Sequence, residues 1–461
     1  GFLRAVTRRF GTWPLFGVIL VWVVLALVVF TVLGWLWGKG PLWSDRWLTN
    51  WRGAGAGASP LDVVKVSLTT IGGIGGTGYL VIKYRERASA ERAERDAEQN
   101  RAEQRLLSGV QQLGSGSPQV RIAGVYSLAD VADTYRGEYR QRVVSILCGY
   151  LRTQRGERET AVNEQDGPEQ SSEEKVYVSH DGAVESTVLE VLVRHLRKRC
   201  EKTKHREAVT QLVEDDQLWC DCTIDLHDAV LTEIADFRGA TFNRYADFQD
   251  ATFNRDADFR GATFNRYADF RGATFNRYAD FWGATFTNVA DFLGATFNRY
   301  ADFRGATFNR YADFWGATFT NVADFLGATF TNSANFLGAT FNHNANFQDA
   351  TFNRDANFRG ATFTNVADFW RATFNHNADF RGATFTNVAN FEGATFNHNA
   401  DFRGATFTNN AYFGGATFSR SAPPMGLPPE QVDEDGLPHG ARWADADDEG
   451  LEAGSPDDAP A

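Results

Sequence analysis

One 11-residue motif, A-D-F-R-G-A-T-F-N-R-Y, repeats without insertion or deletion from Ala235 to Ser421. The first unit starts at Ala235 and the last at Ala411, and the constant spacing between them makes 17 units. In every unit the first and sixth residues are Ala, the third and eighth are Phe, and the seventh is Thr. A fixed short period means that each unit buries its apolar side chains only against its neighbours, so the repeat predicts a solenoid.

Apolar and polar residues alternate within the unit, first in A-D-F and again in A-T-F. Period-two alternation over such short segments predicts strands, and the Gly and Asn between them predict corners. Ala and Phe then point inwards, while Asp or Asn, Thr and the fourth residue point outwards. The units hold 34 of the chain's 38 Phe, so we expect a Phe-filled core that includes Phe237, Phe242, Phe248 and Phe253.

The pentapeptides A-D-F-R-G and A-T-F-N-R resemble units of the pentapeptide repeat family, whose pattern is a small residue, Asp or Asn, Leu or Phe, and two variable residues. The resemblance implies a right-handed, four-sided β-helix with one pentapeptide on each side. A sixth residue follows every second pentapeptide, as at Tyr245 and Val289, so four sides need a 22-residue turn made of two units. The alternative is a two-sided 11-residue turn, in which two Phe and two Ala would crowd a very thin interior.

The two ends of the repeat differ in what the sequence predicts. Ile224–Ile234 keeps the register, because its two leucines lie one full unit before the first two Phe of the repeat. The solenoid prediction then covers 224–421 in nine turns, with the preceding helical region as its N-terminal cap. Residues 422–461 are rich in Pro and Gly and hold 11 Asp and Glu against one Arg, so this acidic tail is predicted to be disordered.

Two stretches near the N-terminus are long and apolar. Trp13–Trp37 carries no charge, and Val63–Ile82 carries one Lys and five Gly. Both are long enough to cross a bilayer, so we predict two transmembrane helices, joined by a short external loop over 38–62. Basic residues in 1–12 and directly after the second stretch place both flanks in the cytoplasm. The expected location is the cell membrane, multi-pass, with both termini cytoplasmic and the lipid bilayer as a partner.

Residues 83–223 are predicted to form a cytoplasmic helical region. Lys83–Arg105 alternates Arg, Glu and Ala, which favours a solvated helix with ion pairs one turn apart. Pro118 opens the first helix of an apolar-periodic hairpin, and Ala183–Cys200 is a further helix. The polar stretch near 154–175 has no apolar periodicity and is predicted to be a loop.

Two segments of this region carry further expectations. Gln112–Arg152 resembles a segment of actinobacterial membrane-anchored pentapeptide repeat proteins, which implies an architecture but no activity. Arg197–Arg206 holds seven basic residues, counting His205. They would meet anionic lipid or nucleic acid, or simply be favourable cations at the C-terminal end of a helix.

The sequence offers no catalytic, cofactor-binding or metal-binding constellation. It contains no P-loop, dinucleotide-binding glycine motif, H-E-x-x-H or G-x-S-x-G. Cys220 and Cys222 form a single C-x-C without a second pair, which is a weak zinc signal. The Asp of the second repeat position recurs as a ladder along the wall, whereas a catalytic pair would occur at one place. We therefore expect no enzyme activity, no cofactor and no small-molecule substrate.

Some pentapeptide repeat proteins present an acidic rod that engages DNA gyrase, so the resemblance implies a gyrase-directed DNA mimic as one alternative. Between Ala235 and Ser421 there are 16 Asp and one Glu against 16 Arg, a net charge of −1. A mimic needs a strong field of one sign. The mixed surface disfavours that function, and it disfavours nucleic acid as a partner.

A few units replace the fourth-position Arg with an apolar residue. In a 22-residue turn, Leu293, Trp315 and Leu337 lie one above another; we call these three residues the apolar stripe. Trp282 and Trp370 share the opposite face with Leu326 midway between them, at 44-residue spacing. An outward apolar stripe is typical of a surface for a protein partner or for self-association, and random drift in a duplicated array is the alternative. The sequence thus favours a membrane-tethered, non-enzymatic interaction scaffold.

Overall fold

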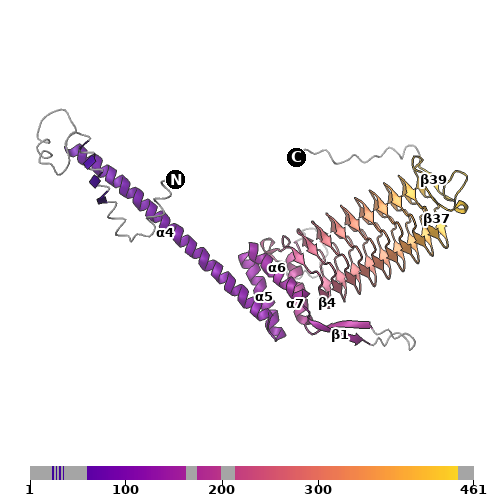
Figure 1. Ribbon diagram of the computed structural model, residues 1–461, viewed down its shortest axis with the longest axis horizontal. Helices are drawn as coiled ribbons and strands as arrows, with labels where there is room; N and C mark the ends of the chain where they lie inside the picture. Colours follow the sequence, from indigo (N-terminus) through magenta and orange to yellow (C-terminus); the bar gives the residue numbers. More distant parts are fainter. Residues whose placement is uncertain are drawn as a thin grey trace. The chain divides into compact units, whose positions relative to one another are not determined.

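The computed structural model describes residues 60–161, 174–198 and 213–444, together with 23–24, 27–28, 31–32 and 35 (Figure 1). The chain divides into two compact units, residues 1–101 and 102–461. The predicted span Trp13–Trp37 lies outside the described residues except for the seven positions just named.

The helix α4 (Pro60–Leu113) is continuous over 54 residues. The predicted second span, Val63–Ile82, is its N-terminal part, and the predicted charged helix follows without a break. Charged side chains one turn apart form ion pairs there as predicted, such as Lys83 with Glu86 at 3.5 Å.

Among the residues that the structure describes, no helix is both long and apolar enough to cross a membrane. In α4 the physical reason is composition, because five Gly and Lys65 dilute the apolar residues of Val63–Ile82. The prediction that this segment spans a bilayer is therefore not supported by the structure.

Three helices, α5 (Pro118–Tyr135), α6 (Gly137–Arg152) and α7 (Gly182–Leu196), form a layer with one shared core. The last turns of α4 pack against the same core. α5 and α6 are the predicted hairpin, and Arg136 and Gly137 turn the chain between them with φ values of 52° and 51°.

Strands β1 (Gly156–Ala161) and β2 (Glu174–Ser179) pair antiparallel, from Gly156 opposite Ser179 to Ala161 opposite Glu174. The structure thus corrects the predicted loop near 154–175 at both of its ends. The ladder is held by backbone hydrogen bonds, which form without any apolar periodicity in the sequence.

The solenoid begins with β3 (Ile224–Asp225) and β4 (Val230–Leu231). In each later unit one strand takes the first two residues, from β5 (Ala235–Asp236) to β37 (Ala411–Tyr412) in odd numbers. The other takes the seventh and eighth residues, from β6 (Thr241–Phe242) to β38 (Thr417–Phe418) in even numbers. These strands form four parallel sheets of nine rungs each, and β39 (Arg442–Trp443) adds a tenth rung to one sheet.

Each strand pairs with the equivalent strand two units away, as Thr263 does with Thr285 and Ala268 with Ala290. One turn therefore holds two units on four sides, as the 22-residue prediction requires, and the two-sided 11-residue turn is wrong. The degenerate first unit is also confirmed, because Ile224 lies opposite Ala246.

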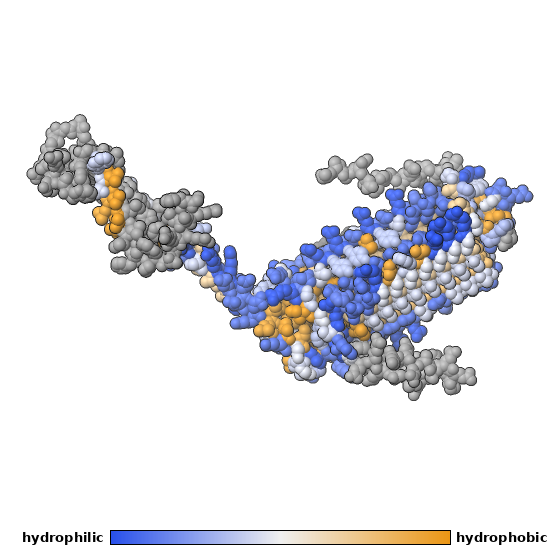
Figure 2. Space-filling model, in the orientation of Figure 1, coloured by the Kyte–Doolittle hydropathy of each residue, from blue (hydrophilic) through white to orange (hydrophobic). Residues whose placement is uncertain are grey.

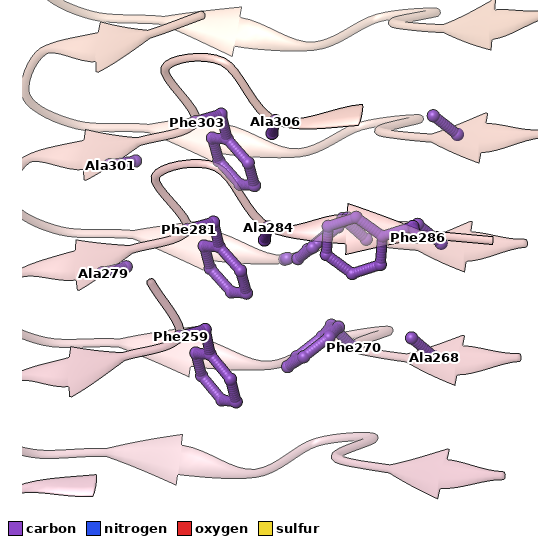
Figure 3. Packing of buried hydrophobic residues seen from close by; sticks show 14 of the residues in the cluster. Phe259, Ala268, Phe270, Ala279, Phe281, Ala284, Phe286, Ala301, Phe303 and Ala306 are labelled. Atoms are coloured by element: carbon purple, nitrogen blue, oxygen red, sulfur yellow. The ribbon is translucent and has the colours of Figure 1, made fainter. Parts of the chain in front are cut away.

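The interior is a set of stacked Phe columns, with Ala between them. Phe281 and Phe303, one rung apart, stack at 4.8 Å between ring centroids, with their planes 1° apart (Figure 3). Phe292, from another side, meets Phe281 edge-on at 5.5 Å. The four Phe predicted as core are at most 1% exposed. Both stacked and edge-on geometries are favourable for aromatic rings, so the repeat buries its apolar surface and satisfies ring electrostatics together.

The corners explain why the second residue is Asp or Asn and the fifth is usually Gly. Asp258 accepts the backbone N–H of Arg260 on Oδ1 at 3.1 Å, and this side-chain turn recurs along the solenoid. The fifth residue then takes a positive φ, for example 61° at Gly261. Asp250, Asp349 and Arg371 keep the same conformation, with φ of 52–55°, where Gly is replaced.

The helical layer covers the open end of the first turn, as predicted for the N-terminal cap. Arg155 and Glu185 form an ion pair of 2.5 Å whose side chains are 4% and 0% exposed. Glu185 accepts the N–H of Thr232 at 2.6 Å, and Arg155 donates to the carbonyl of Val230 at 2.9 Å. The buried pair therefore ties α7 to the first rung.

At the other end, residues 422–444 fold over the last turn, which corrects the prediction that the whole acidic tail is disordered. Met425 forms an isolated parallel β-bridge with Asp401, and β39 pairs with β38. The side chain of Leu437 is only 3% exposed. The last rung offers unpaired backbone groups and an open Phe column, and this segment satisfies both. Residues 445–461 lie outside the described part of the chain.

Candidate interaction surface

The apolar stripe occupies three successive rungs of one sheet, after strands β15, β19 and β23. The N–H of Gly294 donates to the carbonyl of Trp315 at 2.8 Å, and that of Gly316 to Leu337 at 2.9 Å, so the corners stack directly. Trp315 is 50% exposed, and the two leucines are partly buried. The three side chains therefore line one column on the outside of the solenoid.

The same column is charged on both sides of the stripe, with Arg271 before it and Arg359, Arg381 and Arg403 after it. On the solenoid face turned to the viewer in Figure 2, apolar surface occurs in small patches within a hydrophilic or neutral surround. A localised apolar segment with polar flanks has the make-up of a protein interface, in which an apolar centre is surrounded by a polar rim.

Loss of the guanidinium changes the electrostatics beneath the stripe. Arg271 binds Asp269 at 2.6 Å, whereas Asp313 has Trp315 in the equivalent place. Asp313 accepts the N–H of Trp315 and the side-chain amide of Asn335, both at 3.0 Å. Burial nevertheless raises the pKa of Asp313 above its usual range. Trp315 thus replaces a stabilising ion pair on this rung.

The opposite face carries isolated tryptophans instead of a stripe. Trp282 is 55% exposed, and the guanidinium of Arg304 in the next rung lies 6.0 Å from its ring centroid. Trp370 has Arg371 at 5.1 Å in the same way. Each indole is covered in part by a cation, so this face offers no continuous apolar column among the described residues.

Most of the other second-position carboxylates on these two faces are matched by arginines. The fourth-position arginine binds the Asp two residues before it at 2.5–2.7 Å in six units, at Arg238, Arg260, Arg271, Arg304, Arg381 and Arg403. Some of them also reach the next rung, as Arg260 reaches Asp280 at 3.3 Å. The second-position Asp ladder is therefore largely neutralised.

The C-x-C pair belongs to the cap. The Cys220 thiol lies 3.4 Å from the carbonyl of Leu196 at the end of α7. Burial raises the pKa of Cys220 and of Cys222 to about 11, which keeps both as thiols at neutral pH. Their environment suits packing rather than reactivity.

One cluster that the sequence analysis missed brings together Asp225, His227 and Asp247, whose possible ligand atoms lie within 4.8 Å of one another. Arg152 stands beside it, with Nη1 3.1 Å from Asp225. A guanidinium in that position supplies the positive charge that the carboxylate needs, so we assign no metal there. Only the 22-residue turn, which sets Asp225 and Asp247 side by side, could have revealed the cluster.

The comparisons with known proteins agree with this geometry. The model of pentapeptide repeats (9 copies) matches residues 226–274, 237–285, 270–318, 314–362, 325–373, 336–384 and 380–422. No curated protein and no solved structure matches the chain significantly. The four-sided turn and the family match together place residues 226–422 in the pentapeptide repeat family.

Proposed function

We propose that the chain is a non-enzymatic scaffold, tethered to a membrane by its N-terminal region, that binds a protein through the apolar stripe. The observation that carries the proposal is the half-exposed Trp315 between two leucines in adjacent rungs. Tryptophan is one of the residue types enriched at interaction hot spots. Self-association is the form of binding that is simplest to test first.

Membrane tethering rests on the uncharged stretch Trp13–Trp37 and on apolar residues of α4. Leu80 is 67% exposed and Val81 is 53% exposed, with no covering element among the described residues. Such side chains need a bilayer or another helix around them. Carbonate extraction of native membranes tests this part: the full chain should stay in the pellet, and release into the supernatant would contradict it.

The gyrase-directed alternative receives less support. A DNA mimic needs unpaired acidic charge in a regular field, whereas the second-position Asp are paired with arginines and the repeat carries a net charge of −1. Inhibition of supercoiling by the purified chain, at concentrations near stoichiometric with gyrase, would reverse this preference.

The deciding experiment for the stripe changes Trp315→Asp in the full chain and compares association by sedimentation in a neutral detergent. The far-UV spectrum should be unchanged, because the side chain points outwards, and association should be lost. Trp282→Asp is the matched control, since that tryptophan is equally exposed but isolated on the opposite face. If both variants still associate, the apolar stripe is explained by random drift in a duplicated array and not by binding.

A partner other than a second copy calls for proximity labelling in native membranes, with the label placed after Ser421. The wild type is compared with the triple variant in which Leu293, Trp315 and Leu337 are all changed to Asp. A neighbour lost only in the triple variant identifies the partner and its contact face. Identical neighbours in both would count against a scaffold that works through the stripe.

A further inference from the structure

The tenth residues of alternate units form a column along one corner of the solenoid. We call it the basic corner column: Arg244, Arg266, Asn288, Arg310, Asn332, Arg354, His376, His398 and Arg420. His376 and His398 show the stacking directly, with ring centroids 4.9 Å apart. The column holds five Arg and two His, and no acidic residue.

The arginines of this column differ from those of the fourth position. All five are exposed, and within residues 213–444 none of them forms an ion pair with a carboxylate. The guanidinium of Arg420 lies 5.7 Å from the ring centroid of Trp443. The two histidines of the column do have partners, because Nδ1 of His376 lies 2.5 Å from Asp355 and Nδ1 of His398 lies 2.8 Å from Oδ1 of Asn377. Arg244 and Arg266 lie on neighbouring rungs, about 4.8 Å apart, and the other arginines of the column follow at two or three rungs. Like charges in one line repel each other, and an anion along the line relieves that repulsion.

The C-terminal cap delivers the chain to this column. Trp443 lies opposite Phe418, and the N–H of Ala444 donates to the carbonyl of Phe418 at 2.8 Å. One rung lower, Ser419 makes the equivalent bond to Phe396 at 3.1 Å. Ala444 therefore has the register of Ser419. The chain leaves the described structure one residue before the register position of Arg420, at the end of the basic corner column.

The segment that follows, 445–461, has the opposite charge. It includes seven Asp and Glu and no Lys, Arg or His. Fully extended, a chain of this length reaches about 56 Å. The nine rungs from β39 down to Arg244 span about 43 Å. Charge, starting point and length therefore all suit the column.

We propose that segment 445–461 binds along the basic corner column as an acidic strap. Because both partners belong to one chain, their effective concentration is about millimolar, which makes several weak pairs sufficient. The contacts are solvent-exposed and electrostatic, so the strap is released as salt rises. When it is bound, it covers the arginines that any external anion would otherwise meet.

The test places lysines where a carbodiimide can couple them to carboxylates. Arg310→Lys and Arg354→Lys keep the charge at the basic corner column. Arg277→Lys is the matched control, because it lies in the column Arg255, Arg277 and Arg299 on the corner diagonally opposite. Trypsin cleaves after Arg442, so the peptide that begins at Trp443 carries every acid of the segment and reports the cross-link by mass.

At low salt we expect the cross-link yield from Lys at positions 310 and 354 to be severalfold higher than the yield from Lys at position 277. These cross-links should be lost at about 1 M salt, where the Debye length is about 3 Å. Mixing ¹⁴N and ¹⁵N chains separates coupling within a chain from coupling between chains. Equal yields at 277, coupling only between chains, or cross-links to Lys198, Lys202 and Lys204 instead would overturn the proposal. The proposal would also be overturned if no cross-link formed and if the wild type bound anionic vesicles as well as a variant in which the seven acids are neutralised.

Discussion

Asp280 accepts the backbone N–H of Trp282 at 3.0 Å, in a rung where tryptophan stands in place of the usual arginine. Asp302, one rung away, has Arg304 at 2.6 Å and is fully buried. The two carboxylates make the same side-chain turn but differ in the guanidinium beside them: Arg304 binds Asp302 from two residues on, whereas Asp280 has only Arg260 of the neighbouring rung, at 3.3 Å.

We expect Asp280→Asn to stabilise the fold at neutral pH. Burial raises the pKa of Asp280 to about 6 from 3.8, so the folded state binds this proton more tightly than the unfolded state. Its contribution is greatest below about pH 4 and is lost as pH rises through about 6. At pH 7 the free energy of unfolding of the variant should exceed that of the wild type by on the order of 1–3 kcal/mol, so the variant should also melt at a higher temperature. The difference in stability should disappear towards pH 4. Asp302→Asn, which breaks an ion pair, should melt lower at pH 7; equal shifts for both variants would contradict this reasoning.

Phe303→Ala should open the middle of the core, because it removes stacks with Phe281 and Phe325, both at 4.8 Å. The expected cost is about 3–5 kcal/mol. Hydrogen exchange should quicken in the rungs around it before the ends are affected. Phe303→Leu should cost much less, since Leu226 already fills the equivalent third-position core site in the first unit. Uniform loss of protection along the whole solenoid would show that the rungs do not behave as nearest-neighbour units.

Glu185→Ala should release the N-terminal cap. It leaves Arg155 buried without its counter-charge, which costs about 3–5 kcal/mol in comparable pairs. Limited proteolysis should then cut near β3, and replacing both residues with apolar ones (Arg155→Met with Glu185→Leu) should restore resistance. Glu103→Ala breaks the exposed pair with Arg142 and should leave the pattern unchanged. If Glu185→Ala and Glu103→Ala were equally sensitive to proteolysis, the buried pair would not be what holds the N-terminal cap on the solenoid.

Gly426→Ala should loosen the C-terminal cap. Gly426 has φ of 75°, and an added Cβ would clash with the backbone of Arg403. Exchange at Phe402 and Met425 should speed up while the central rungs keep their protection. Gly414→Ala is the control, because an added Cβ there meets nothing closer than 3.5 Å. If Gly426→Ala and Gly414→Ala left hydrogen exchange equally slow, the contact between Gly426 and the backbone of Arg403 would not be what holds the cap on the last rung.

The repeat itself made the core predictable. Ala and Phe recur at fixed positions in all 17 units, and counting the sixth residue of alternate pentapeptides leads to the 22-residue turn. The position of the apolar stripe within one column follows from the same count. Physical packing is periodic here, so a periodic sequence contains most of it.

Features that depend on one particular contact could not be predicted in this way. The cap over the last rung uses Met425 and Leu437, which are isolated among Pro, Gly and acidic residues. A total of 16 Asp and 16 Arg does not distinguish Arg260, paired with its own Asp, from Arg354, which stands at a corner. The second-position Asp was predicted to face outwards, but its bond to the N–H two residues on requires the folded corner.

The mismatch between an 11-residue unit and a 22-residue turn limits how such an array can change in length. Insertion of a single unit between Trp315 and Leu337 would rotate everything after it by half a turn, and the two residues would then lie on opposite faces. Insertion of two units would leave every later side chain on its own face, one rung further along. Gene duplication can therefore lengthen this molecule without disturbing its surfaces only in even steps.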